Sequence, residues 1–451
     1  MNIHFIAIGG SAMHSLALAL NANHHTITGS DDEIFEPSRS RLAEAGILPE
    51  HMGWHPERIH PKLDAIVLGM HAHADNPELQ RAQELGIPIY SYPEFMHRQC
   101  SHKQRIVIGG SHGKTTITSM VMHGLRKNNR AFDYLVGALV EGFDNPVSLH
   151  PETTIAVFEG DEYLASTIDR RPKFHLYHPH IALISGIAWD HMNVFPTEDD
   201  YISQFSTFID LIEKGGYLVY CAEDADVKAL IENHPRRNSG EITLIPYGTP
   251  KHSIAHGVTT LHYGGNNFTM NVFGRHNLQN LEGARSVCKV LGVTGIEFYS
   301  ALSDFTGAAR RLEKLREEGD MVVYRDFAHA PSKLKATVLA VKEQYPERRI
   351  VACMELHTYS SLNKQFLHQY AGSMDGLDAA LVYYSPAVVA QKRLPAISKD
   401  DIMNAFERHD LIVATENAEV QSFIDHHLDA NTVLLLMSSG NWGGGVRYTS
   451  I

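Results

Sequence analysis

One segment of the sequence has residue types suited to binding a polyphosphate. Gly109-Gly110-Ser111-His112-Gly113-Lys114-Thr115-Thr116 lies between an apolar stretch of strand length and a stretch of helical character. Such a loop turns backbone N–H groups toward phosphate oxygens, its lysine supplies positive charge, and a threonine hydroxyl can ligate Mg²⁺. The strict phosphate-loop pattern has glycine where Ile108 stands, so this loop departs from it at one position. We predict that the segment binds a triphosphate.

The loop has the form G-[ST]-x-G-K-T and resembles that of the Mur ligase family and its relative folylpolyglutamate synthetase. Enzymes of this kind activate a carboxylate with ATP and couple it to an amine. The family also has a strand-end acidic residue, an Asp-His pair, a His-Asn segment, an arginine and a late Asp-x-x-His. All of these features occur in this chain, in that order. The resemblance implies an ATP-dependent carboxylate-amine ligase that uses ATP and Mg²⁺.

The resemblance implies roles for several other residues. Glu159 in TIAVFEGDEY and His191 in GIAWDHMNVF each follow a predicted strand, and the family has catalytic groups there beside the loop lysine, Lys114. The implied metal ligands are Thr115, Glu159 and His191, whose oxygen and nitrogen donors suit divalent cations. The implied ATP-binding residues outside the loop are His276, Asn277, Asn280, Arg311 and Asp326. Arg310, directly before Arg311, is expected to face away.

The late motif departs from the family pattern. Asp326 and His329 in YRDFAHAP match Asp-x-x-His, and the resemblance implies that His329 contacts the acceptor. Ala330 stands where the family commonly has a second histidine. Because that imidazole is absent, a nucleotide-gated binding protein without turnover stays open as an alternative.

A second glycine-containing loop lies near the N-terminus. Ile8-Gly9-Gly10-Ser11-Ala12-Met13 lacks the third glycine of GxGxxG, which argues against an NAD site. By resemblance to the peptidoglycan branch of the family, Gly9, Gly10, Ser11, Ala12 and Met13 contact the diphosphate of a UDP-sugar. Asp31 ends the next strand, where its carboxylate can accept from a ribose hydroxyl or support the loop. This separate N-terminal segment favours the peptidoglycan branch over folylpolyglutamate synthetase.

Two branches of the family activate UDP-N-acetylmuramate, and they differ in the acceptor amine. One adds L-alanine, and the other adds the tripeptide L-alanyl-γ-D-glutamyl-meso-diaminopimelate. The segments Gly160–Tyr163 and Asp169–Phe174 resemble an ADEY…DKRSKF segment of the tripeptide branch. Arg170, Arg171 and Lys173 would suit an acceptor with several carboxylates. We therefore predict the tripeptide, in peptidoglycan recycling or synthesis, with L-alanine as the alternative.

Two other segments weaken the tripeptide assignment. ELHTYSSLN, residues 355–363, is nearer to the corresponding segment of the alanine branch. The chain ends with GNWGGGVRYTSI, without the final helix usual in the tripeptide branch. The acceptor therefore remains open between these two amines.

The composition fits an ordinary folded protein and excludes several classes of partner. The 451 residues include 39 basic and 52 acidic ones, a net charge of −13, so we expect no nucleic acid partner. The four cysteines lie far apart without zinc-site spacing. No apolar stretch is long enough for a membrane span. We expect a cytoplasmic enzyme, a monomer or weak dimer, that acts on small molecules.

The elements that position these residues alternate between strand-length apolar runs and helical segments. This rhythm is typical of parallel α/β sheets, and it begins again after residue 103 and after residue 298. We predict a UDP-sugar-binding Rossmann-like domain over 1–103, a P-loop ATPase-like domain over 104–298 and a Rossmann-like, acceptor-binding domain over 299–451. The fold class is α/β with the three-domain Mur ligase architecture. Residues 248–271 are predicted to form an antiparallel flap.

Overall fold

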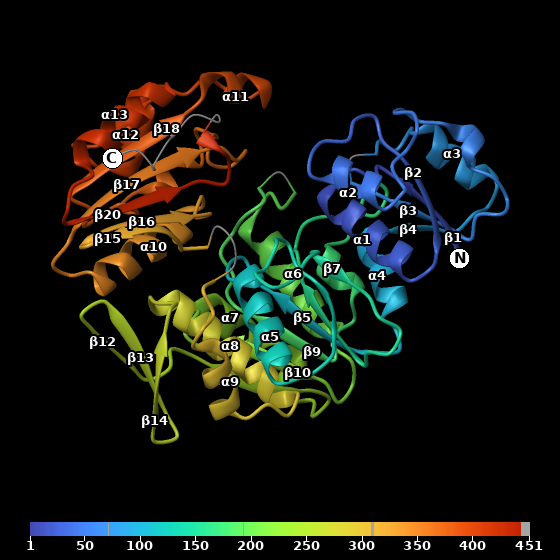
Figure 1. Cartoon of the computed structure of the whole chain (residues 1–451), viewed down its shortest axis with the longest axis horizontal. Coiled ribbons are helices and arrows are strands. Elements are labelled where there is room, and N and C mark those ends of the chain that lie inside the picture. Colours follow the sequence, from blue (N-terminus) through green and yellow to red (C-terminus); the bar gives the residue numbers. More distant parts are fainter. Residues whose placement is uncertain (71, 193, 308–310, 443–451) are drawn as a thin grey trace. The chain divides into compact units, whose positions relative to one another are not determined.

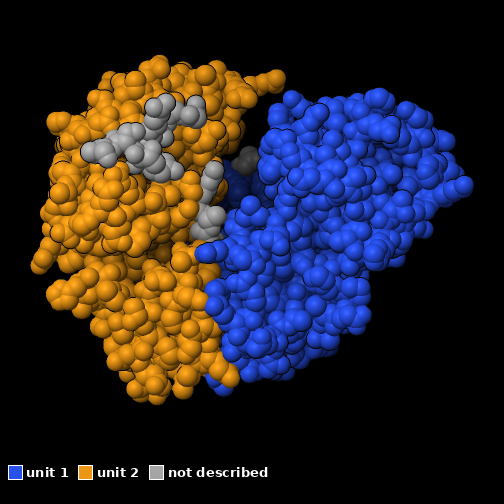
Figure 2. All heavy atoms as spheres, viewed as in Figure 1, with its two compact units in different colours: residues 1–248, 283–294 blue, residues 249–282, 295–451 orange. Residues whose placement is uncertain are grey.

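The computed structural model describes residues 1–70, 72–192, 194–307 and 311–442. They divide into two compact units, which Figure 2 shows in different colours. Unit 1 comprises residues 1–248 and 283–294, and unit 2 comprises residues 249–282 and 295–451. No helix in the described part of the chain is both long enough and apolar enough to span a bilayer.

Unit 1 begins with a four-stranded sheet of order β2-β1-β3-β4, in which all paired strands are parallel (Figure 1). The strands are β1 (Asn2–Ile6), β2 (Thr26–Ser30), β3 (Ala65–Leu68) and β4 (Ile89–Ser91). The connecting helices are α1 (Ser11–Ala22), α2 (Ser38–Glu44), the short 3-10 helix η1 (Pro56–Arg58), α3 (Pro77–Glu84) and α4 (Tyr92–Gln99). Parallel neighbours need crossover connections of this kind. The Gly9-Gly10 loop therefore lies at the carboxyl end of β1, directly before α1.

The second sheet of unit 1 has seven strands in the order β11-β10-β9-β5-β8-β6-β7. The strands are β5 (Gln104–Gly109), β6 (Asp133–Leu135), β7 (Val147–Ser148), β8 (Ile155–Glu159), β9 (Ile181–Ile184), β10 (Tyr217–Cys221) and β11 (Thr243–Tyr247). The helices are α5 (Lys114–Lys127), η2 (Lys173–Leu176), α6 (Glu198–Asp210), α7 (Ala225–Asn233) and η3 (Pro235–Asn238). Only the pairing of β7 with β6 is antiparallel. Because β5, β8 and β9 are parallel neighbours, the residues that follow them meet at one edge of the sheet.

Unit 2 contains a six-stranded sheet of order β15-β16-β20-β17-β18-β19. The strands are β15 (Glu313–Glu318), β16 (Met321–Asp326), β17 (Arg349–Leu356), β18 (Ala379–Tyr384), β19 (Ile412–Ala414) and β20 (Thr432–Met437). Helix α8 (Arg275–Val290) belongs to unit 2 up to Glu282 and to unit 1 from Gly283. The later helices of unit 2 are α9 (Gly295–Leu302), α10 (Pro331–Gln344), η4 (Leu367–Tyr370), α11 (Pro386–Gln391), α12 (Lys399–Phe406) and α13 (Asn417–His427). Strand β15 is antiparallel to β16, and the other pairs are parallel.

The predicted antiparallel flap is confirmed. Strands β12 (His252–Ala255), β13 (Val258–Tyr263) and β14 (Asn266–Met270) pair in sequence order with antiparallel register. The Thr259 hydroxyl donates to the Gln344 side-chain oxygen at 2.9 Å, which connects the flap to the end of helix α10.

Candidate active site

The predicted phosphate loop connects the carboxyl end of β5 to the first residue of α5. Gly110 and Gly113 have φ values of +129° and +81°, which a residue with a side chain rarely adopts. A Cβ on Gly110 would also overlap the Ser185 hydroxyl and approach the Ser185 backbone nitrogen to 3.0 Å. Both glycines are therefore needed for this loop conformation, which leads into the N-terminus of a 14-residue helix.

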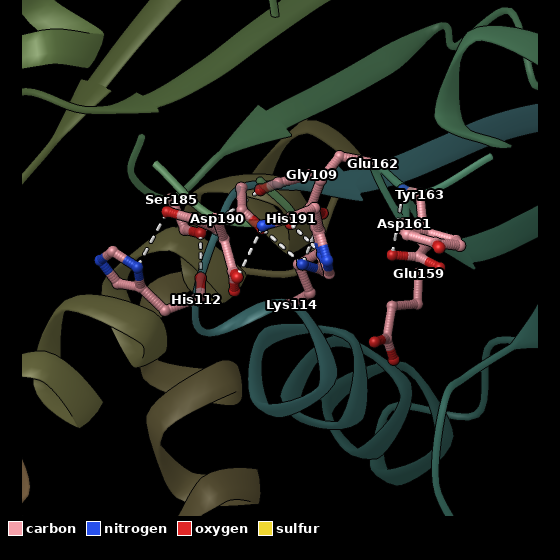
Figure 3. A network of polar contacts seen from close by, with 12 residues as sticks. Gly109, His112, Lys114, Glu159, Asp161, Glu162, Tyr163, Ser185, Asp190 and His191 are labelled. Atoms are coloured by element: carbon pink, nitrogen blue, oxygen red, sulfur yellow. Dashed lines mark hydrogen bonds and ion pairs between the residues drawn. The ribbon is translucent and has the colours of Figure 1, made fainter. Parts of the chain in front are cut away.

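Thr115 and Glu159 lie together, as the resemblance implied. The Thr115 hydroxyl donates to Glu159 Oε1 at 2.9 Å, and the Gly137 N–H donates to Glu159 Oε2 at 2.7 Å. The carboxylate reaches this position because β8 is the immediate neighbour of β5 in the sheet. Figure 3 shows Glu159 beside the start of the helix that carries Lys114. The two oxygen donors form a pair that can hold a hard cation such as Mg²⁺.

Lys114 is bound to the carboxylate of Glu162, a residue that the sequence does not mark as its partner. Its ammonium donates to Glu162 Oε2 at 2.6 Å and to the Gly110 carbonyl at 2.7 Å. The Glu162 side chain is 1% exposed, and its other oxygen accepts from the Tyr201 hydroxyl at 3.0 Å. The same oxygen lies 3.5 Å from His191 Nε2 (Figure 3).

Each charged side chain of this cluster stabilises the charged form of its neighbours. Burial alone would lower the pKa of Lys114, but Glu162 and Asp161 outweigh it and raise that pKa. Burial would likewise raise the pKa of Glu162, but Lys114 and His191 hold it well below its usual range. For His191, the carboxylates of Glu162 and Asp190 overcome burial and raise the pKa. At neutral pH, Lys114 is therefore a cation and Glu162 an anion.

His191 shares a possible cation site with Asp161 and Glu162. One donor atom from each of these residues lies within 4.8 Å of the donor atoms of the other two. Among the described residues, this is the group of three histidine, cysteine or acidic side chains that could hold a metal ion. Its carboxylate and imidazole donors fit a divalent cation, as do the oxygens of Thr115 and Glu159. The implied ligands thus fall into two donor sets, one at Thr115–Glu159 and one around His191.

The N-terminal loop is held by Asp31. The Gly9 N–H donates to Asp31 Oδ2 at 2.7 Å, and a Cβ on Gly9 would approach that oxygen to 2.9 Å. Of the two roles considered for Asp31, the structure shows the one in which its carboxylate supports the loop. Burial raises the pKa of Asp31 to about 6 despite this hydrogen bond. The roles of Gly10, Ser11, Ala12 and Met13 toward a UDP-sugar remain predictions.

In unit 2, the fold brings two of the residues implied for ATP binding together. His276 is the second residue of α8. Burial lowers the pKa of His276, and the nearby Asp326 carboxylate opposes that shift. Asp326, at the end of β16, is 7% exposed and accepts from the Thr337 hydroxyl at 2.6 Å. The Asn277 amide donates to the Phe273 carbonyl at 3.1 Å. Asn280 is also buried.

Arg311 and His329 both contact the ring of Phe327. The Arg311 guanidinium is 4.4 Å from the centre of the Phe327 ring. His329 packs edge-on against the same ring, with 5.2 Å between the ring centres. Arg310 lies outside the described residues, so its expected outward orientation stays a prediction.

The cations predicted to bind the acceptor are mostly neutralised by their own segment. Arg171 makes a bidentate contact with Asp169, with distances of 3.0 and 2.7 Å, and Lys173 donates to Asp161 at 2.6 Å. Arg170 is exposed and has no carboxylate partner among the described residues. The segment therefore offers one uncompensated cation instead of three.

We expect replacement of Thr115 with valine to lower ADP formation about a hundredfold, because the variant loses one of the two oxygen donors beside the loop. Thr115→Ser keeps the hydroxyl and should restore the rate to within a few-fold of the parent. Steady-state assays over a range of Mg²⁺ concentrations would test this. Equal rates for the valine and serine variants would contradict a role for the hydroxyl.

Comparison with known proteins extends the match along most of the chain. Residues 2–104 match the Mur ligase family catalytic domain, residues 108–288 the Mur ligase middle domain, and residues 310–440 the Mur ligase glutamate ligase domain. The UDP-N-acetylmuramate–L-alanine ligase of Caldicellulosiruptor bescii is 31% identical over 393 residues, which cover 84% of this chain and 82% of that protein. The enzyme of the same name from Streptomyces avermitilis is 29% identical and covers 97% and 94%.

Solved structures agree on the fold. UDP-N-acetylmuramate-alanine ligase MurC from Thermotoga maritima superposes with a TM-score of 0.71 at 20% identity, covering 99% of this chain and 97% of that one. A murein peptide ligase from Psychrobacter arcticus gives 0.64 at 24%, covering 98% and 97%. The predicted three-domain Mur ligase architecture is therefore confirmed. The chain belongs to the Mur ligase family and is an ATP-dependent ligase that forms amide C–N bonds in peptidoglycan assembly.

Proposed function

We propose that the enzyme joins the lactyl carboxylate of UDP-N-acetylmuramate to the amine of L-alanine. The observation that carries this proposal is the match to curated relatives named UDP-N-acetylmuramate–L-alanine ligase, which runs over nearly the full length of both chains. The pairing of Arg171 and Lys173 with carboxylates of their own segment also weakens the argument for an acceptor with several carboxylates. We therefore favour L-alanine over the tripeptide predicted from that segment.

The first step we propose is phosphorylation of the sugar-borne acid. A carboxylate oxygen attacks the γ-phosphorus of ATP, the bond to the β–γ bridging oxygen breaks, and ADP leaves an acyl phosphate behind. Lys114 would neutralise charge that spreads over the transferred phosphoryl group, and the loop N–H groups would hold the phosphates. Thr115 and Glu159 would hold Mg²⁺, which when bound lowers the negative charge of the phosphates.

The second step forms the amide. The neutral α-amine of L-alanine attacks the acyl carbon, inorganic phosphate leaves, and the amine nitrogen releases a proton. His191 lies 3.5 Å from Glu162, and it would stabilise negative charge on the tetrahedral intermediate. The binding roles of His276, Asn277, Asn280, Arg311, Asp326 and His329 rest on the family resemblance and remain predictions. The domain limits, the cytoplasmic location and the oligomeric state also remain predictions.

The tripeptide is the second candidate, and the loop from Gly160 to Phe174 favours it. This segment carries the ADEY-like and DKRSKF-like patterns, and Arg170 remains exposed within it. A single free cation could bind one of the extra carboxylates of the tripeptide.

Phosphate release by the purified protein separates these possibilities. The assay contains UDP-N-acetylmuramate, ATP and Mg²⁺, with either L-alanine or the tripeptide as the amine, and mass spectrometry identifies the product. We expect kcat/KM to be at least about a hundredfold higher with L-alanine, a difference of about 2.7 kcal/mol. A preference for the tripeptide would overturn the acceptor assignment. Absence of ADP formation with both amines would instead support a binding protein without turnover.

A further inference from the structure

The Lys114 ammonium is paired with a buried carboxylate, that of Glu162. Its contact with Glu162 is 2.6 Å long, and the side chains are 14% and 1% exposed. A charge-assisted hydrogen bond in so dry a location is much stronger than one at the surface. Glu162 and the Gly110 carbonyl occupy two of the three N–H donors of Lys114, so the phosphates of a nucleotide on this loop would compete with Glu162 for the ammonium.

Glu162 is well placed to lose this partner without becoming isolated. Its Oε1 accepts from Tyr201 at 3.0 Å and lies 3.5 Å from His191, whereas Oε2 contacts Lys114. The two oxygens thus serve different neighbours, so the carboxylate keeps polar contacts after Lys114 moves. Asp161 differs, because its carboxylate is held by Lys173 at 2.6 Å.

We propose that Glu162 is a positioning residue that holds Lys114 in the nucleotide-free enzyme and competes with the phosphates of ATP for it. The contact stabilises the lysine in the loop, because an unpaired buried ammonium would be costly. It also lowers the affinity for nucleotide, because part of the binding free energy is used to break the Lys114–Glu162 pair. This inference concerns nucleotide binding in the proposed ATP site and does not depend on the acceptor.

The test is the affinity of the Glu162→Gln variant for Mg²⁺ and a nonhydrolysable ATP analogue, measured by titration calorimetry without sugar or amine. We expect the variant to bind the analogue about tenfold more tightly than the parent. A purely structural role for Glu162, or a role as a cation ligand with Asp161 and His191, predicts weaker or unchanged binding, and either result would overturn the proposal. If the glutamine variant does not fold, Glu162→Asp replaces it. Its shorter side chain should bind Lys114 less well and give a smaller increase, so unchanged or weaker binding would again overturn the proposal.

Two control variants distinguish the effect of the Lys114–Glu162 contact from the effect of the overall negative charge around Lys114. Asp161→Asn removes a nearby negative charge that pairs with Lys173 instead, so it should tighten binding much less than Glu162→Gln. Tyr201→Phe removes a hydrogen bond to Glu162 but leaves its charge, so it should leave binding within about twofold of the parent. Equal tightening by Asp161→Asn would show that charge alone, and not the contact, sets the affinity. Weaker nucleotide binding by the Lys114→Met variant would confirm that the loop is the site being titrated. A wrong acceptor assignment would not change this result, because no amine is present in the titration.

Discussion

Replacing Lys114 with methionine should lower the rate of ADP formation about a thousandfold, while the fold of the protein is retained. Methionine has a similar length but no charge, so the variant cannot neutralise the negative charge that develops on the transferred phosphoryl group. The measurement is ADP release with UDP-N-acetylmuramate and L-alanine at saturating ATP. Because chemistry is affected as well as binding, more ATP should not restore the rate.

The variant also leaves Glu162 without its cation, so the controls must separate catalysis from folding. Lys114→Met combined with Glu162→Gln removes the unpaired buried charge and should be as inactive as the single variant. Lys127→Met, at the exposed end of the same helix α5, should keep the parental rate. If the single variant of Lys114 retained a tenth of the parental rate, the loop could not be the catalytic phosphate site.

Replacing Lys103 with methionine should lower the free energy of unfolding of unit 1 by about 3–5 kcal/mol. Its ammonium is 2% exposed and donates to Asp133 at 2.5 Å, to the His150 carbonyl at 2.6 Å and to the Thr153 hydroxyl at 2.8 Å. The side chain of Asp133 is fully buried, so the variant leaves a carboxylate without its cation in a dry environment. Urea unfolding followed by circular dichroism would measure the loss.

An exposed ion pair provides the control for this stability prediction. Lys314 contacts Glu317 at 2.5 Å, but the two side chains are 50% and 45% exposed. Solvent weakens such a pair, so Lys314→Met should change stability by less than about 1 kcal/mol. If the Lys103 variant lost no more than the Lys314 variant, burial of the Lys103–Asp133 pair would not be the source of the stability.

Apolar periodicity was enough to predict most of the central strands. Runs such as RIVIGG, HIALISG and TVLLLMSSG are buried on both faces of parallel sheets, and they correspond to β5, β9 and β20. No apolar run marks strand β15, because its sequence, EKLREE, is charged. It lies at the edge of its sheet and pairs with β16 alone, a position where charged side chains remain in water. Helix α6 contains no continuous apolar run, and its buried face is formed by the spaced aromatic side chains of Tyr201, Phe205 and Phe208.

The residues of the candidate site also differ in how well the sequence predicts them. The glycines of the loop and its lysine are recognisable from sequence because local backbone geometry requires them at that spacing, and the partner of Thr115, Glu159, follows from its place at the end of a strand. The carboxylate that binds Lys114 could not be predicted from local sequence. Glu162 is 48 residues from Lys114 and 39 from Tyr201, and neither spacing carries a periodic signal. The pairing of Lys173 with Asp161 likewise depends on how one segment folds back on itself. Local chemistry is encoded by neighbours along the chain, whereas the sharing of buried charge depends on which segments pack together.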